Sequence, residues 1–115
     1  MKNHPESSVA VFAVWEPMLP TDWDAPGTSV LNRLNDRRVR QFWDPDHVLA
    51  TVIKKAESSG QVHPDCCVLR GFLWDLAAAY APGSRWGDML PEAVLLNGPV
   101  VENAAALEAI VEKSR

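Results

Sequence analysis

Apolar and polar residues along the chain follow two periods, one typical of strands and one typical of helices. Residues 9–15 (VAVFAVW) are apolar throughout and rich in β-branched side chains, which is the pattern of a strand buried on both faces. Glu16 and Pro17 end this run, because proline cannot donate a hydrogen bond to a strand ladder. Residues 39–43 (VRQFW) predict a second, shorter strand.

The segment between these two strands predicts a short helix. Val30, Leu31 and Leu34 have the spacing of one helical face. Thr28 or Ser29 is the expected N-cap, since a hydroxyl oxygen can accept a hydrogen bond from a free amide of the first turn.

Two further helices are predicted. One follows His47 and ends at Gly60, and its apolar face is formed by Val48, Leu49, Val52, Ile53 and Ala56. The other covers residues 104–113, with Asn103 as its cap.

The remaining apolar runs predict two more strands. Residues 69–80 contain the third, written FLWDLAAAY and bounded by a Pro-Gly turn. Residues 93–96 form the fourth, and Asn97-Gly98 directly after it is a strong turn signal.

The predicted order of elements is β-α-β-α-β-β-α. Two strands that are each followed by a helix favour parallel pairing through right-handed crossovers, and the last two strands are close enough for an antiparallel connection. We therefore expect an α/β fold with a single mixed four-stranded sheet and helices on both faces. Residues 9–115 are predicted to form one domain after a flexible polar N-terminus at residues 1–8.

Composition narrows the classes of function. Hydrophobic residues make up 47% of the 115 residues, which is enough for one core. The formal net charge of -4 argues against a nucleic-acid surface, and the basic cluster of Arg33, Arg37, Arg38 and Arg40 is too small for a phosphate track. We interpret that cluster as part of a solvated loop and helix end.

The sequence predicts a soluble chain. No apolar run approaches the roughly 20 residues of a membrane span, and the N-terminal apolar stretch lacks the cleavage site of a signal peptide. The expected location is the cytoplasm, with no membrane and no nucleic-acid partner.

A tryptophan followed by a carboxylate ends both of the first two strands. Ligands of open α/β sheets bind beyond the carboxyl ends of parallel strands, so both pairs are expected at one rim. Aromatic walls with carboxylates and an imidazole suit a small cationic or polar ligand. The predicted ligand-binding residues are Trp15, Glu16, Asp22, Trp43, Asp44, Asp46 and His47.

A structural explanation of the same residues stays open. Tryptophan at a strand end fills the space between sheet and helix, and Asp44 or Asp46 can cap the helix that follows. Asp22 lies in a turn-rich loop, where it can cap backbone amides. A third pair, Trp74-Asp75, lies inside a predicted strand rather than after one.

The adjacent cysteines Cys66 and Cys67 are the second candidate site. Adjacent Cα atoms lie about 3.8 Å apart, whereas unstrained disulfides need roughly 4.4 to 6.8 Å, so a bond between them would be strained and easily reduced. The pair is a candidate for redox catalysis, or for a soft-metal site together with His63. Two small cysteines that only pack are the alternative, and no second cysteine pair completes a structural zinc site.

Two resemblances add to these patterns. The order of elements and the closing stretch LPEAVLLNGPVVENAAALEAIVEK are similar to those of thioredoxins. The chain also resembles a group of small uncharacterised bacterial proteins with the motifs VWEPxLPTDW, QFWDP, and CC followed by LWDxAAxYxPG. The resemblance implies a thioredoxin-like fold. It does not imply thioredoxin activity, because residues 16–19 (EPML) stand where thioredoxins have Cys-x-x-Cys.

Two functions therefore remain in view. The first is a thioredoxin-like binding or accessory module without Cys-x-x-Cys, with a cleft at the rim for a small molecule or a protein partner. The second is thiol-dependent redox or soft-metal chemistry at Cys66 and Cys67. A homodimer that uses exposed aromatic residues as its interface is a third interpretation. No cofactor fingerprint and no nucleophile elbow is present, so neither a cofactor nor a reaction class is predicted.

Overall fold

The computed structural model describes residues 3–17, 24–58, 67–69 and 72–114. Contacts divide the described residues into two compact units. The first unit lies within Met1–Val48 and Val111–Arg115, and the second lies within Leu49–Ile110.

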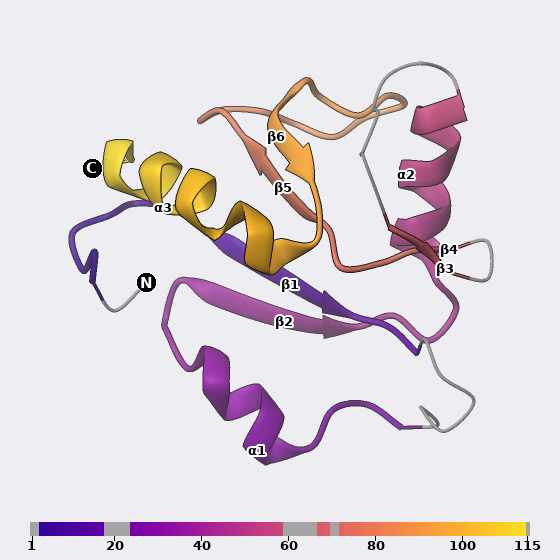
Figure 1. The fold of residues 1–115 in the computed structure, drawn as a ribbon, viewed down its shortest axis with the longest axis horizontal. Helices are drawn as coiled ribbons and strands as arrows, with labels where there is room; N and C mark the ends of the chain where they lie inside the picture. Colours follow the sequence, from indigo (N-terminus) through magenta and orange to yellow (C-terminus); the bar gives the residue numbers. More distant parts are fainter. Residues whose placement is uncertain (1–2, 18–23, 59–66, 70–71, 115) are drawn as a thin grey trace. The chain divides into compact units, whose positions relative to one another are not determined.

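The first unit is built on a parallel pair of strands, β1 (Val11–Trp15) and β2 (Val39–Trp43) (Figure 1). Their register places Val11 opposite Val39 and Trp15 opposite Trp43, so both strands end at the same level. The pairing continues one step further, because the amide of Asp44 donates to the carbonyl of Trp15 at 2.7 Å.

The connection between these strands contains α1 (Thr28–Leu31) and the 3₁₀ helix η1 (Asn32–Leu34). The helix is present where the spacing predicts it, but its N-cap is Gly27 and no side chain caps it. Neither Thr28 nor Ser29 is the cap, since the helix already begins at Thr28.

Burial along β1 and β2 alternates from residue to residue, as in a sheet with one sheltered and one exposed face. Phe12, Val14 and Phe42 are exposed, and the rings of Phe12 and Phe42 lie 6.2 Å apart. The expectation that the first strand is buried on both faces is wrong. A two-stranded ribbon lacks the layers that cover both faces of a larger parallel sheet.

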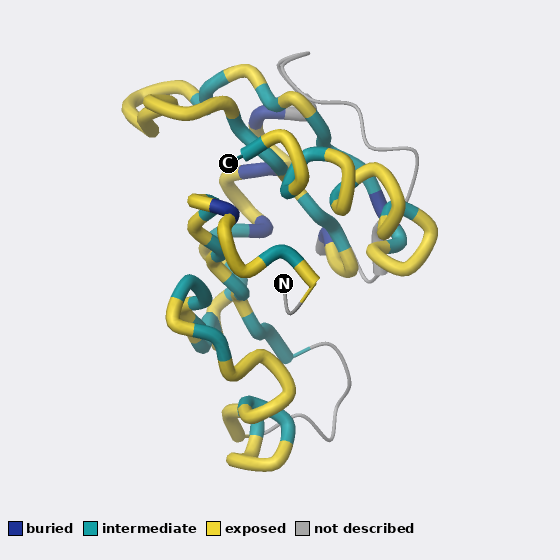
Figure 2. Tube along the Cα trace, turned by 90° about the vertical axis from the view of Figure 1, so that its left-hand side faces the viewer, coloured by how far each residue is buried: buried dark blue, intermediate teal, exposed yellow. Residues whose placement is uncertain are grey.

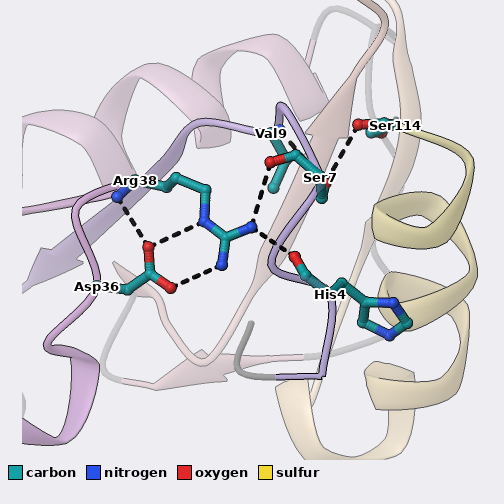
Figure 3. A network of polar contacts seen from close by, with 6 residues as sticks. All are labelled: His4, Ser7, Val9, Asp36, Arg38 and Ser114. Atoms are coloured by element: carbon teal, nitrogen blue, oxygen red, sulfur yellow. Dashed lines mark hydrogen bonds and ion pairs between the residues drawn. The ribbon is translucent and has the colours of Figure 1, made fainter.

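The N-terminal segment of the first unit is bound by a network around Arg38 (Figure 3). Its Nη1 donates to the carbonyls of His4 and Ser7 at 2.6 and 3.2 Å, and its Nε and Nη2 donate to the carboxylate of Asp36. Ser7 is buried, and its Oγ donates to the carbonyl of Ser114. Arg38 is therefore a structural residue sheltered from solvent, and not part of the solvated loop that the basic cluster suggests.

The second unit contains short antiparallel pairs. β3 (Val68–Leu69) pairs with β4 (Phe72–Leu73), and β5 (Ala77–Tyr80) pairs with β6 (Ala93–Asn97). The ladder between β5 and β6 has an irregularity between Ala79 and Tyr80.

Helix α2 (Val48–Ser58) provides the core of the second unit. Ile53 and Ala56, one helical turn apart, pack with Leu73, and Leu49, Leu76, Leu90 and Leu96 surround them. Buried positions are few among the described residues (Figure 2). The buried apolar area of this unit is therefore concentrated in the cluster of Ile53, Ala56 and Leu73.

The last helix, α3 (Ala104–Lys113), has the predicted bounds. A 3₁₀ turn, η2 (Val100–Asn103), leads into it. The side chain of Asn103 donates to the carbonyl of Pro99 at 2.9 Å.

The predicted order β-α-β-α-β-β-α of an α/β chain is confirmed, with the small hairpin β3–β4 as an addition. The prediction of one mixed four-stranded sheet is wrong, because the described strands pair two by two. The run that predicts the third strand is interrupted at Trp74 and Asp75. Asp75 has φ +52, a left-handed conformation in which a strand cannot continue, and its Oδ1 accepts a hydrogen bond from the amide of Val100.

Candidate functional site

The carboxyl ends of β1 and β2 bring two predicted site residues into contact. Nδ1 of His47 lies 3.2 Å from Oε2 of Glu16, although 31 residues separate them in sequence. Both side chains are mostly sheltered, with 15% of Glu16 and 14% of His47 exposed. We call these two residues, with Trp15, Trp43 and Asp44, the rim.

The local sequence explains why His47 reaches Glu16. Trp15-Glu16 and Trp43-Asp44 stand side by side in the register of the two strands, so the residues after them leave the sheet together. Between Asp44 and His47 the chain turns, and the amide of His47 donates to the carbonyl of Asp44 at 3.4 Å.

His47 itself has φ +54, in the left-handed region. Residues other than glycine are uncommon there, although histidine, asparagine and aspartate are enriched among them. Such a conformation stores a small amount of strain, and strained residues are concentrated at functional sites.

Asp44 connects the rim to the start of α2. Its Oδ1 accepts a hydrogen bond from the amide of Val48 at 3.0 Å, which satisfies one of the free amides at the helix start. Asp44 therefore caps the helix, as the structural explanation of this residue predicts, whereas Asp46 is exposed. The carboxylate of Asp44 is also close enough to act on the charge of Glu16.

The pKa of the Glu16 carboxyl is raised above its usual value, first because burial removes water from the charged form and then because Asp44 repels it. The hydrogen bond and positive charge of His47 act in the opposite direction. Burial dominates, so the ionised carboxylate of Glu16 is less well solvated than one on the surface.

The second carboxylate oxygen of Glu16, Oε1, accepts no hydrogen bond from the described residues. Across the described part of the chain, His47 provides the one hydrogen bond to this side chain, and it reaches Oε2 rather than Oε1. An acceptor that is mostly sheltered and only half satisfied favours an N–H or O–H donor from outside.

Trp15 is held by a residue that sequence reasoning missed. Its Nε1 donates to Oε1 of Gln41 at 2.9 Å, and Nε2 of Gln41 donates to the carbonyl of Leu31. Gln41 therefore joins the indole to the end of α1. The available signal was a glutamine at a sheltered position of β2, where a polar side chain needs partners.

The other predicted site residues divide into three groups. Trp43 ends β2 opposite Trp15 and is partly buried. Asp22, His63 and Cys66 lie outside the described residues. Cys67 is disulfide-bonded and thus is not a free thiol.

Two further features, a metal site and a membrane-spanning helix, are absent from the described residues. No group of three or more histidine, cysteine, aspartate or glutamate side chains there is arranged to hold a metal ion. None of the helices described is long and apolar enough to cross a membrane. A shallow, open hollow of about 450 Å³ is lined by Pro5, Asp36, Arg37 and Arg38, none of which belongs to the rim.

Comparisons with protein-family models, curated proteins and solved structures found no match to this chain. The resemblances to thioredoxins and to the bacterial group therefore stay predictions.

Proposed function

We propose that this protein is a non-catalytic binding module that takes a small polar ligand at the rim. The observation that carries the proposal is the Glu16–His47 contact, which leaves Oε1 of a mostly sheltered carboxylate without a protein donor among the described residues. A ligand that donates a hydrogen bond to Oε1 would provide this oxygen of the Glu16 carboxylate with a partner.

The surroundings of Glu16 support a binding role. Gln41 fixes the indole of Trp15, the residue before Glu16, and Trp43 stands opposite Trp15 in the strand register. Fixed aromatic side chains beside a few polar groups are the usual lining of small-molecule sites. The strained backbone of His47 supports the same interpretation, since strain is concentrated at functional positions.

A non-catalytic role is favoured over an enzymatic one. The rim holds an imidazole and carboxylates, but no serine, threonine or cysteine is among its five residues, so it lacks a hydroxyl or thiol nucleophile. A small molecule is favoured over a protein partner, because the unsatisfied group is a single atom rather than an extended surface.

Intrinsic tryptophan fluorescence tests the proposal, since two tryptophans belong to the rim. A panel of small amines, amides, sugars, amino acids and carboxylic acids is titrated into the wild type and into Glu16→Gln. Glu92→Gln is the matched control, because Glu92 is an exposed glutamate of the other unit. We expect at least one compound to change the emission of the wild type and Glu92→Gln, with a markedly weaker response in Glu16→Gln. Responses that do not depend on Glu16, or no response to any compound, would contradict the proposal.

The disulfide of Cys67 supports a second candidate function, namely thiol–disulfide exchange. An external dithiol would reduce this disulfide and would itself be oxidised. The disulfide speaks against metal capture in the same state, because the thiolate is the metal ligand.

A further inference from the structure

We infer that β2 is the interface of a homodimer, in which the β2 strands of two copies pair antiparallel about a two-fold axis at Gln41. This interface is independent of the proposed function, because it uses an edge of the sheet and not the carboxylate of Glu16. The outer edge of β2 faces away from β1 and carries backbone groups that no described residue pairs (Figure 1).

The strand register shows which backbone groups lie at this outer edge. The amide of Asp44 donates to the carbonyl of Trp15, so the backbone of Asp44 points toward β1. Because successive residues of a strand point their backbone groups to opposite sides, the amides and carbonyls of Gln41 and Trp43 point away from β1. No described residue bonds to them, since Gln41 contacts Leu31 through its side chain and not through its backbone.

An unpaired strand edge favours the addition of another strand. Its free amides and carbonyls can bond to an extended chain that lies beside it. No proline interrupts residues 39–43, so Gln41 and Trp43 each offer both a donor and an acceptor. Two-stranded sheets are marginally stable, whereas a second copy of β2 extends this one to four strands in the order β1-β2-β2-β1.

The charges at the two ends of β2 select a second copy in the antiparallel direction. Arg37 and Arg40 lie at the start of the strand, and Asp44 and Asp46 follow its end. Antiparallel pairing places the basic start of each strand beside the acidic end of the other, whereas parallel pairing places like charges together. Arg37, Arg40 and Asp46 are exposed and form no ion pair with described residues. The outer edge of β2 is therefore complementary in charge to its own antiparallel copy.

The exposed side chains of β2 match in the same register. With Gln41 on the two-fold axis, Arg40 lies opposite Phe42 of the partner subunit. These two residues form a pair without backbone hydrogen bonds, the kind in which facing side chains are closest. Arg40 and Phe42 lie on one exposed face, and 49% of Phe42 is accessible. A guanidinium over this ring adds a cation–π contact, and both residue types are enriched in protein interfaces.

Sedimentation equilibrium of the full chain, over a range of protein concentrations, tests this interface through two charge reversals. Arg37→Glu and Asp46→Arg are studied separately and as an equimolar mixture. Arg85→Glu is the matched control, because Arg85 is an exposed arginine of the other unit.

We expect the wild type and Arg85→Glu to dimerise with equal affinity. Each reversal should weaken the dimer roughly tenfold, since the two-fold axis makes every substitution act at two contacts. The equimolar mixture should recover the affinity of the wild type, because the introduced acid of one variant faces the introduced base of the other. Recovery of this kind is specific to antiparallel pairing.

Hydrogen exchange of the wild type provides a second measurement that needs no variant. The amides of Gln41 and Trp43 should exchange more slowly as dimer forms with rising protein concentration, because they then donate to the partner subunit. A wild type that stays monomeric at every concentration would overturn the inference. So would a dimer that both reversals leave unchanged, a mixture that does not recover, or a dimer in which these two amides stay unprotected. Protection of both amides in the monomer would show that the chain itself covers the edge, and would overturn the inference as well.

Discussion

Nδ1 of His47 lies 3.2 Å from Oε2 of Glu16, and this contact joins the end of one strand to the turn after its neighbour. The two residues meet because β1 and β2 are parallel and end in register. The resulting pair is mostly sheltered, and Oε1 of the carboxylate accepts no hydrogen bond from the described residues. Several measurable properties of the protein depend on it.

The stability of the protein should respond to Glu16 in a pH-dependent way. The pKa of Glu16 is raised in the folded state, so its contribution to stability is full below the pKa of the unfolded chain and is lost as the pH rises through the folded pKa. Glu16→Gln should therefore gain stability relative to the wild type as the pH rises from about 4 to about 7. Urea denaturation at a series of pH values measures this difference, and Glu92→Gln should not show it.

The backbone of His47 predicts an unusual order of stability between two variants. Both His47→Gly and His47→Ala lose the contact with Glu16, so the difference between them isolates the backbone. At φ +54, glycine should be more stable than alanine by about 1 kcal/mol, since Cβ disfavours the left-handed region. Denaturant midpoints of the two variants would show this order, and an equally stable or more stable alanine variant would exclude the left-handed conformation.

Arg38 should hold the N-terminal segment in place. Arg38→Ala removes the donors to the carbonyls of His4 and Ser7 together with the ion pair to Asp36. We expect faster hydrogen exchange at the amide of Ser8, which donates to the carbonyl of Ser114. The exposed neighbour Arg37 provides the control variant Arg37→Ala, and equal exchange rates in the two variants would contradict this role.

The same network should weaken in acid. Arg38 holds the pKa of Asp36 far below its usual value, so the contribution of this carboxylate is present above the pKa of the unfolded chain and is lost as the pH falls through the folded pKa. The loss should be absent in Asp36→Asn. Comparison of acid unfolding of the wild type and this variant measures it, and parallel acid transitions would count against the ion pair.

The stability of the second unit should depend strongly on the side chain of Leu73. Only 2% of this side chain is exposed, and it packs against Ile53 and Ala56. Leu73→Ala should lower the free energy of unfolding by about 2 to 5 kcal/mol, through lost burial and the cavity that remains. Val94→Ala, at a position that is 65% exposed, should change it by less than about 1 kcal/mol. Urea denaturation of both variants provides the comparison, and similar losses would contradict the assigned core.

Sequence patterns were informative where one local signal decided the structure. The apolar runs and the Trp-acid pairs were enough to predict β2 and the common end of β1 and β2, because strand ends follow from proline and charged residues. The bounds of α3 also follow from local signals. These elements place Glu16 and Asp44 close together before any tertiary contact is known.

Other features depended on contacts that sequence does not display. The left-handed conformations of His47 and Asp75 are not marked by glycine, so the break in the third strand could not be predicted from its apolar residues. The contact between Glu16 and His47 needs the turn after Asp44, and the partners of Gln41 come from β1 and α1. Pairing partners are long-range properties, whereas apolar periodicity reports only local conformation.

Mapping of ligand-induced chemical-shift changes over the whole chain tests the central claim most directly. The compound that gives the strongest fluorescence response is titrated into isotopically labelled wild-type protein. The account predicts that the largest changes fall on Trp15, Glu16, Trp43, Asp44 and His47, and that they disappear in Glu16→Gln but not in Glu92→Gln. Changes that are centred on other residues, or that persist in Glu16→Gln, would contradict the assignment of the rim as the binding site.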